Sequence, residues 1–119
     1  MSDYSDVSLI EKKLRDASSR IFTMSGNVGQ ARQVREYDSD RRKNLLAKYA
    51  RASLKAGESA AGSEAIARSD PGYRAEFEAL AAQREAAERL IATWEAMHVI
   101  YEAHRSMLSM KKEEMKVLE

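Results

Sequence analysis

The sequence predicts an all-α fold in which a helical hairpin precedes one long C-terminal helix. Alanine, glutamate, lysine, leucine and arginine are abundant, a composition typical of long helices and coiled coils. Apolar residues recur at spacings of three and four along most of the chain. Pro71 is the only proline, and few runs are rich in the β-branched residues of strands.

The first predicted helix covers residues 3–23. Gly26 and Gly29 follow, and each costs about 1 kcal/mol of helix propensity. We therefore expect the helix to end after residue 23, with a continuation to Val34 left open. Its apolar residues alternate in spacing between three and four, which is the pattern of a coiled-coil seam: Val7, Ile10, Leu14, Ala17, Ile21, Met24, Val28 and Ala31.

A second helix is predicted to begin near Asp38 or Ser39, because either side chain can accept hydrogen bonds from the free amides of a helix start. It should weaken at Gly57, where a small and flexible stretch begins. A short helical turn is expected over residues 63–68. The apolar side of this second helix consists of Leu45, Tyr49, Ala52 and Ala56.

The long C-terminal helix is predicted to start at the sequence Ser69-Asp70-Pro71, because proline is tolerated in the first turn of a helix. Nothing breaks the helix from there to Glu119, and such a rod is roughly 70 Å long. Its apolar residues, mostly three and four apart, are Tyr73, Phe77, Leu80, Ala87, Leu90, Ile91, Trp94, Met97, Tyr101, Leu108, Met115 and Leu118.

The length of this rod predicts self-association. A compact chain of this size has a radius of gyration near 13–14 Å, so we expect the last helix to extend beyond the two helices before it. An apolar stripe that the chain cannot cover marks an interface. We expect a homo-oligomer held by coiled-coil-like seams, with these interface residues: Leu80, Ala87, Ile91, Trp94, Tyr101 and Leu108.

Positive charge is concentrated in the second predicted helix, although the whole chain has a net charge of only +1. Between residues 39 and 56 the only acid is Asp40. Such a stripe repels itself unless something negative lies along it, and a phosphate backbone would do so. The residues predicted to bind nucleic acid are Arg41, Arg42, Lys43, Lys48, Arg51 and Lys55. A solvated face and an acidic protein partner remain open alternatives.

The basic helix also bears on the role of Tyr49 and on the division of the chain into two parts. Tyr49 lies between basic residues and could stack on an unpaired base, although packing in the core is favoured. The chain divides into residues 1–62, the N-terminal helices with the basic DNA-contacting helix, and residues 63–119, the oligomerisation helix.

Several classes of function are not expected. The chain has no cysteine, no glycine-rich phosphate loop and no nucleophile with a nearby base, so we expect neither an enzyme nor a cofactor. Glu95 and His98 have the spacing of helical di-metal sites, but the second copy that such a site needs is missing, and no metal is expected. No uncharged stretch is long enough to span a membrane, so the expected location is a cytoplasm.

The order of features resembles the UvsY family of bacteriophage recombination mediators. The matching stretches are NLLAKYARASLKAGES, which holds Lys48, Arg51 and Lys55, then GSEAIARSD, and ERLIATWEAMHVIYEAHRSML with its Trp94. The resemblance implies a ring-shaped oligomer in the cytoplasm of a bacterial host. It also implies binding of single-stranded DNA and the loading of a RecA-like recombinase onto strands covered by single-strand-binding protein. The alternative is a phage structural, assembly or inhibitor protein that acts through protein–protein contacts.

Overall fold

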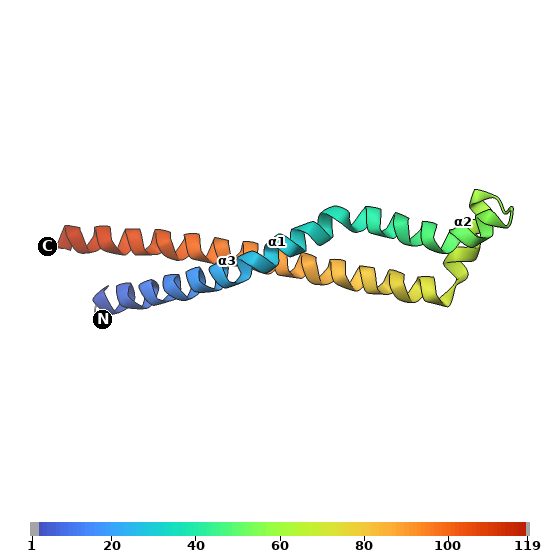
Figure 1. Cartoon of the computed structure of the whole chain (residues 1–119). Coiled ribbons are helices and arrows are strands. Elements are labelled where there is room, and N and C mark those ends of the chain that lie inside the picture. Colours follow the sequence, from blue (N-terminus) through green and yellow to red (C-terminus); the bar gives the residue numbers. More distant parts are fainter. Residues whose placement is uncertain (1–2, 119) are drawn as a thin grey trace. The chain divides into compact units, whose positions relative to one another are not determined.

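The computed structural model describes the backbone of residues 3–118 and the side chains of residues 6–118, and its fold is all-α. Three helices follow one another along the chain: α1 (Asp3–Lys55), α2 (Ala60–Ser69) and α3 (Pro71–Leu118) (Figure 1). The predicted end of the last helix at Glu119 lies outside the described residues. The predicted class and the long C-terminal helix are confirmed.

The chain forms two compact units, and both long helices contribute to each. Unit 1 consists of Met1–Gly29 and Leu90–Glu119. Unit 2 consists of Gln30–Arg89 and therefore includes all of α2. Within each unit, a part of α1 lies beside a part of α3 (Figure 1). The boundary that the sequence predicted after residue 62, between the N-terminal helices and the oligomerisation helix, therefore falls inside unit 2.

The first 53 residues of the fold are one helix, so the predicted break between two N-terminal helices is wrong. Gly26 and Gly29 lie inside α1, and a Cβ atom built on either would have open space around it. The seam continues across them, since Val28 and Ala31 are both buried. Burial along a continuous seam outweighs a propensity loss of about 1 kcal/mol per glycine, because most helix stability in proteins comes from packing.

Asp38 is not a helix cap, and this prediction is corrected too. It lies within α1 at the spacing of seven that joins Ala31, Asp38 and Leu45, and it is only 4% exposed. Its carboxylate pairs with Arg42 at 2.8 Å and with Arg84 of α3 at 3.1 Å. A charged residue therefore occupies a seam position, where the sequence suggested the start of a helix.

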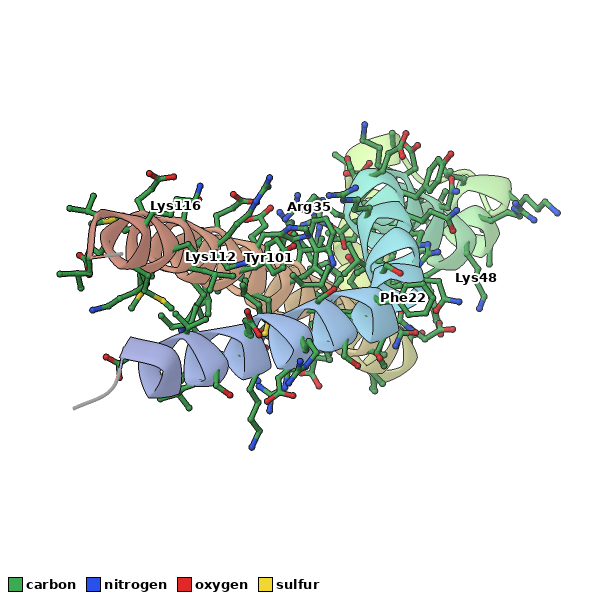
Figure 2. All side chains as sticks on the ribbon, turned by 90° about the vertical axis from the view of Figure 1, so that its left-hand side faces the viewer. Phe22, Arg35, Lys48, Tyr101, Lys112 and Lys116 are labelled. Atoms are coloured by element: carbon green, nitrogen blue, oxygen red, sulfur yellow. The ribbon has the colours of Figure 1, made fainter. Side chains whose placement is uncertain are left out.

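Ion pairs show that α1 and α3 run antiparallel in unit 2. Arg35 pairs with Glu88 at 2.7 Å, and Lys48 pairs with Glu76 at 3.2 Å (Arg35 and Lys48 are labelled in Figure 2). From the first pair to the second, the residue number on α1 rises and that on α3 falls, so the two helices run in opposite directions. With 53 residues, α1 is also longer than the 48-residue α3.

The connection from α1 to α3 explains the position of α2. Gly57 has a φ of 94°, a left-handed conformation that suits glycine and stops α1. The Ser59 side chain accepts a hydrogen bond from the Gly62 amide at 3.0 Å and caps α2. Ser63 and Ala67 are buried, so α2 packs on the rest of unit 2. The predicted helical turn is thus a full, slightly longer helix.

The start of α3 at Pro71 is confirmed, with one residue between it and α2. The Asp70 carboxylate accepts a hydrogen bond from the Gly72 amide at 2.7 Å. A Cβ on Gly72 would lie 2.9 Å from the Tyr49 hydroxyl, so the Tyr49 side chain of α1 would have to move if this residue were not glycine. Next to it, the rings of Tyr49 and Tyr73 meet edge to face at 5.9 Å.

Unit 1 is a pair of antiparallel helix segments with a narrow core. Ile10 and Ala17 of α1 and Ile91 of α3 are buried in it. The N- and C-terminal ends of the described chain lie at the same end of this unit (Figure 1). Among the described helices, none is both long enough and apolar enough to cross a membrane.

Candidate nucleic-acid interface

The six basic residues predicted to bind nucleic acid all lie on α1 in unit 2, but they divide between two flanks of the helix. Arg41 and Lys48 line a surface hollow that also contains Glu76 of α3. Arg42 and Lys43 line a different hollow, on the opposite side of the seam. Arg41 and Lys48 thus lie in one group, and Arg42 and Lys43 in another.

Two of the six residues are neutralised by acids of the same chain. Arg42 pairs with the buried Asp38, and Lys48 pairs with Glu76. The Lys48 ammonium also lies 5.4 Å from the centre of the Tyr49 ring. The Lys48 side chain is nevertheless 65% exposed, so its ion pair is open to water and contributes little stability.

Tyr49 joins the two long helices through Glu76. The Tyr49 hydroxyl donates a hydrogen bond to the Glu76 carboxylate, which lowers the pKa of that carboxyl below its ordinary 4.5, and Lys48 lowers it further. The same hydrogen bond, with burial as a second cause, raises the pKa of Tyr49 to about 12. These contacts and the ring of Tyr73 support the packing role of Tyr49 that the sequence favoured.

Four basic residues are left without an ion pair among the described side chains: Arg41, Lys43, Arg51 and Lys55. All four are exposed, and all lie between residues 41 and 55 of one rigid helix. The only acid within that stretch or directly before it is the exposed Asp40. This is a concentration of uncompensated positive charge on a chain whose net charge is +1.

Sequence reasoning missed two residues beside this charge. Arg68 of α2 and Phe77 of α3 line the same hollow as Arg42 and Lys43. A signal for Arg68 existed, because the single residue between α2 and Pro71 forces the end of α2 to lie against the start of α3. No sequence signal assigned Phe77, since an aromatic in a seam pattern is expected in the core.

Two acids of α3, Glu76 and Glu88, are engaged with basic residues of α1. Glu88 receives two hydrogen bonds from the Arg35 guanidinium, at 2.8 and 2.7 Å. These bonds lower the pKa of the Glu88 carboxyl below its ordinary 4.5, and the charges of Arg35 and Arg84 add to the effect. Such carboxylates are already compensated and oppose an approaching polyanion less than free ones would.

The predicted oligomer-interface residues are covered within the single chain to different degrees. Ala87 and Ile91 are buried, whereas Leu80, Trp94, Tyr101 and Leu108 are partly exposed (Tyr101 is labelled in Figure 2). The large apolar side chains that stay exposed on the C-terminal part of α3 are a different set: Val99, Ile100, Met107, Met110, Val117 and Leu118. Four of them, Ile100, Met107, Met110 and Val117, are spaced by seven, three and seven residues.

The described side chains contain no group of three or more histidine, aspartate or glutamate residues placed to hold a metal ion. The ring of His98, which has the spacing of a metal ligand relative to Glu95, meets the ring of Trp94 edge to face at 4.2 Å. Comparison of the chain with protein-family models, with curated proteins and with solved structures gave no match.

Proposed function

We propose that this chain is a non-enzymatic, homo-oligomeric protein that binds single-stranded DNA without sequence specificity. Its specific role would be that of a recombination mediator, which helps a RecA-like recombinase load onto strands covered by single-strand-binding protein. The observation that carries DNA binding is the set of four basic residues on α1 that have no acidic partner among the described side chains. The mediator role rests on the resemblance to the UvsY family.

Counterion release gives these charges their effect. Each phosphate of a single strand that a basic side chain neutralises contributes about 0.7 to the slope of log affinity against log salt. Four contacts from one subunit give a slope of about −3. No element of this region is built to read base edges in a groove, so the binding depends on the backbone and ignores sequence.

An exposed apolar surface suited to self-association supports the same function. The exposed stripe of Ile100, Met107, Met110 and Val117 on α3 has the spacing of a coiled-coil seam and offers a surface for sister chains. Several subunits would multiply the four charges along one strand, and linked weak contacts bind far more tightly than single ones. The ring-shaped arrangement is the part of this proposal that depends on the family resemblance.

The same apolar stripe favours a second candidate function. A helix that exposes six large apolar side chains between residues 99 and 118 is suited to docking on another protein. In that case the chain is a phage structural, assembly or inhibitor protein. The positive charge on α1 would then meet an acidic protein surface.

The first test removes three of the unpaired charges together, through Arg41→Ala, Arg51→Ala and Lys55→Ala. We expect the affinity for a fluorescent oligo(dT), measured by anisotropy at about 50 mM salt, to fall at least tenfold, and the salt slope to fall by about 2. Lys48 is left in place because it pairs with Glu76.

The matched control removes the same amount of charge elsewhere. Lys12, Arg15 and Lys112 are exposed, lie in unit 1 and have no recorded ion pair among the described side chains. Alanine at these three positions should change affinity less than threefold, and light scattering should give the same mass for both variants. If both triple variants bind alike, the assignment of DNA binding to α1 is wrong.

The mediator role needs its own assay. We expect the protein to shorten the lag before a RecA-like recombinase hydrolyses ATP on single strands already covered by single-strand-binding protein. The α1 triple variant should leave the lag long. An unchanged lag with the intact protein, when DNA binding is normal, would reject the mediator role and retain DNA binding.

A further inference from the structure

A hollow of roughly 590 Å³ lies in unit 2 on the flank of α1 away from Arg41 and Lys48. Its size is within the range of about 300–1,000 Å³ that is usual for small-molecule sites. All three helices line it, with the side chains of Arg42, Lys43 and Leu46 from α1, Arg68 from α2, and Tyr73 and Phe77 from α3.

The cationic side of this hollow has unused capacity to bind an anion. Asp38 holds the Arg42 guanidinium through one terminal nitrogen, while the buried Arg42 Nε has no hydrogen-bond partner. Lys43 has no ion pair among the described side chains. Arg68 has only a long contact of 3.6 Å with Glu64. Because Arg42, Lys43 and Arg68 all line the hollow, an anion there would lie beside positive charge that is only partly compensated.

The apolar side of the hollow is aromatic. Tyr73 is buried, and its ring lies 5.8 Å from that of Phe77 at an angle of 31°. Phe77 itself is 36% exposed, and it also borders the neighbouring hollow that contains Arg84. A partly exposed phenylalanine that shares a hollow with Arg42, Lys43 and Arg68 offers a stacking surface to a flat ligand that carries negative charge.

We propose that this hollow holds one nucleotide of a single strand, with its phosphate near Arg42, Lys43 and Arg68 and its base against the Phe77 ring. This inference rests on the proposed DNA binding and assigns it a second contact besides the charges of Arg41, Arg51 and Lys55. It also predicts a preference for single strands, because the bases of a duplex are stacked on one another and cannot reach a protein ring.

The central test is Phe77→Leu. Loss of one stacked base is expected to weaken oligo(dT) binding by about tenfold, without changing the salt slope and without changing binding of duplex DNA. Phe77→Tyr keeps a ring and should restore most of the affinity. Phe22→Leu is the matched control, since Phe22 is an 82% exposed aromatic of unit 1 (labelled in Figure 2), and it should bind like the unaltered protein.

Two measurements locate the phosphate and the base. The double change Lys43→Ala and Arg68→Ala should reduce the salt slope by about 0.7, as expected for the loss of one phosphate contact. An oligonucleotide with 5-iodouracil, irradiated on the protein, should cross-link to the tryptic peptide of residues 75–84, in which Phe77 is the only aromatic.

The outcomes separate this inference from the function on which it rests. If oligo(dT) binds and needs Arg51 and Lys55, but Phe77→Leu binds like the unaltered protein, the nucleotide site is wrong and DNA binding by α1 stands. A cross-link confined to other peptides also overturns the site. If no oligonucleotide binds even at low salt, the proposed function fails first, and this inference fails with it.

Discussion

Asp38 provides the sharpest test of how the two long helices recognise each other. Its buried carboxylate lies between Arg42 of α1 and Arg84 of α3, at 2.8 and 3.1 Å. Asp38→Asn removes the negative charge and keeps the shape. Hydrogen bonds that involve charged groups contribute about 1.5–3 kcal/mol each. Full loss of a buried ion pair costs about 3–5 kcal/mol.

The expected loss is smaller than that upper range, because both arginines can return to water. Their side chains are 41% and 49% exposed, whereas that of Asp38 is 6% exposed. We therefore expect Asp38→Asn to lower the free energy of unfolding by about 1–3 kcal/mol. With a urea dependence of about 1–3 kcal/mol per molar, the midpoint should fall by about 1 M.

The assay is urea unfolding followed by circular dichroism at fixed protein concentration, since association would couple stability to concentration. Asp40→Asn is the matched control, because Asp40 is exposed and has no recorded ion pair among the described side chains. It should change stability by less than about 0.5 kcal/mol. Equal midpoints for the two variants would refute the reasoning.

A companion change separates stability from register. Asp38→Leu loses the ion pairs but buries an apolar side chain at a seam position, which contributes about 1.5–3 kcal/mol. The net effect on stability should be close to zero. The antiparallel register should become less specific, because polar seam residues fix register at a cost in stability. A cysteine pair across the two helices would report the change as additional cross-linked species.

The remaining predictions concern glycines and acid. Gly26→Ala and Gly29→Ala should each raise the free energy of unfolding by about 0.5–1 kcal/mol, measured by thermal unfolding, because a Cβ has open space at both positions. Gly57→Ala should lower it by about 1 kcal/mol in the same assay, because its φ of 94° strains any other residue. The lowered pKa values of Glu76 and Glu88 stabilise the fold above the unfolded-state value near 4.5, and this contribution is lost as pH falls through the folded-state values. Stability should thus decrease between about pH 5 and pH 3, and Glu88→Gln should make that decrease shallower in urea titrations at each pH.

The start of α3 could be predicted because Pro71 leaves few alternatives. A proline has a fixed φ and no amide hydrogen, so it marks the first turn of a helix whatever surrounds it. Gly57 correctly indicated the end of α1 for a similar reason, since its backbone conformation suits glycine. Local covalent chemistry decides both positions, and the sequence contains that information directly.

The continuity of α1 could not be predicted from the same kind of evidence. Gly26 and Gly29 weaken the helix locally, but the decision depends on burial against α3, which involves residues distant in the chain. Asp38 was misread because an aspartate before a basic run is also a typical helix start. Its partner Arg84 is 46 residues away, and no local pattern reveals that pair.

The candidate site was predictable in its charge and not in its arrangement. The basic run on α1 was evident, but ion pairing of Lys48 with Glu76 depends on the antiparallel register of two helices. The joining of Arg68 and Phe77 with Lys43 in one hollow depends on where α2 folds back. Burial within the chain of Ile91, predicted at an oligomer interface, likewise depends on pairing that the sequence alone does not specify.

The short connection between α1 and α2 has a consequence for the integrity of the protein. Among residues 3–118, only residues 56–59 and Asp70 lie outside helices. Proteases cut exposed, non-helical segments, so a glutamate-specific enzyme has one favourable site, at Glu58. The cut would separate α1 from α2 and α3 covalently, yet the packing of α1 along α3 in both units would remain. A nicked molecule should therefore stay together until denaturant releases its two pieces, and the halves made separately should reassemble.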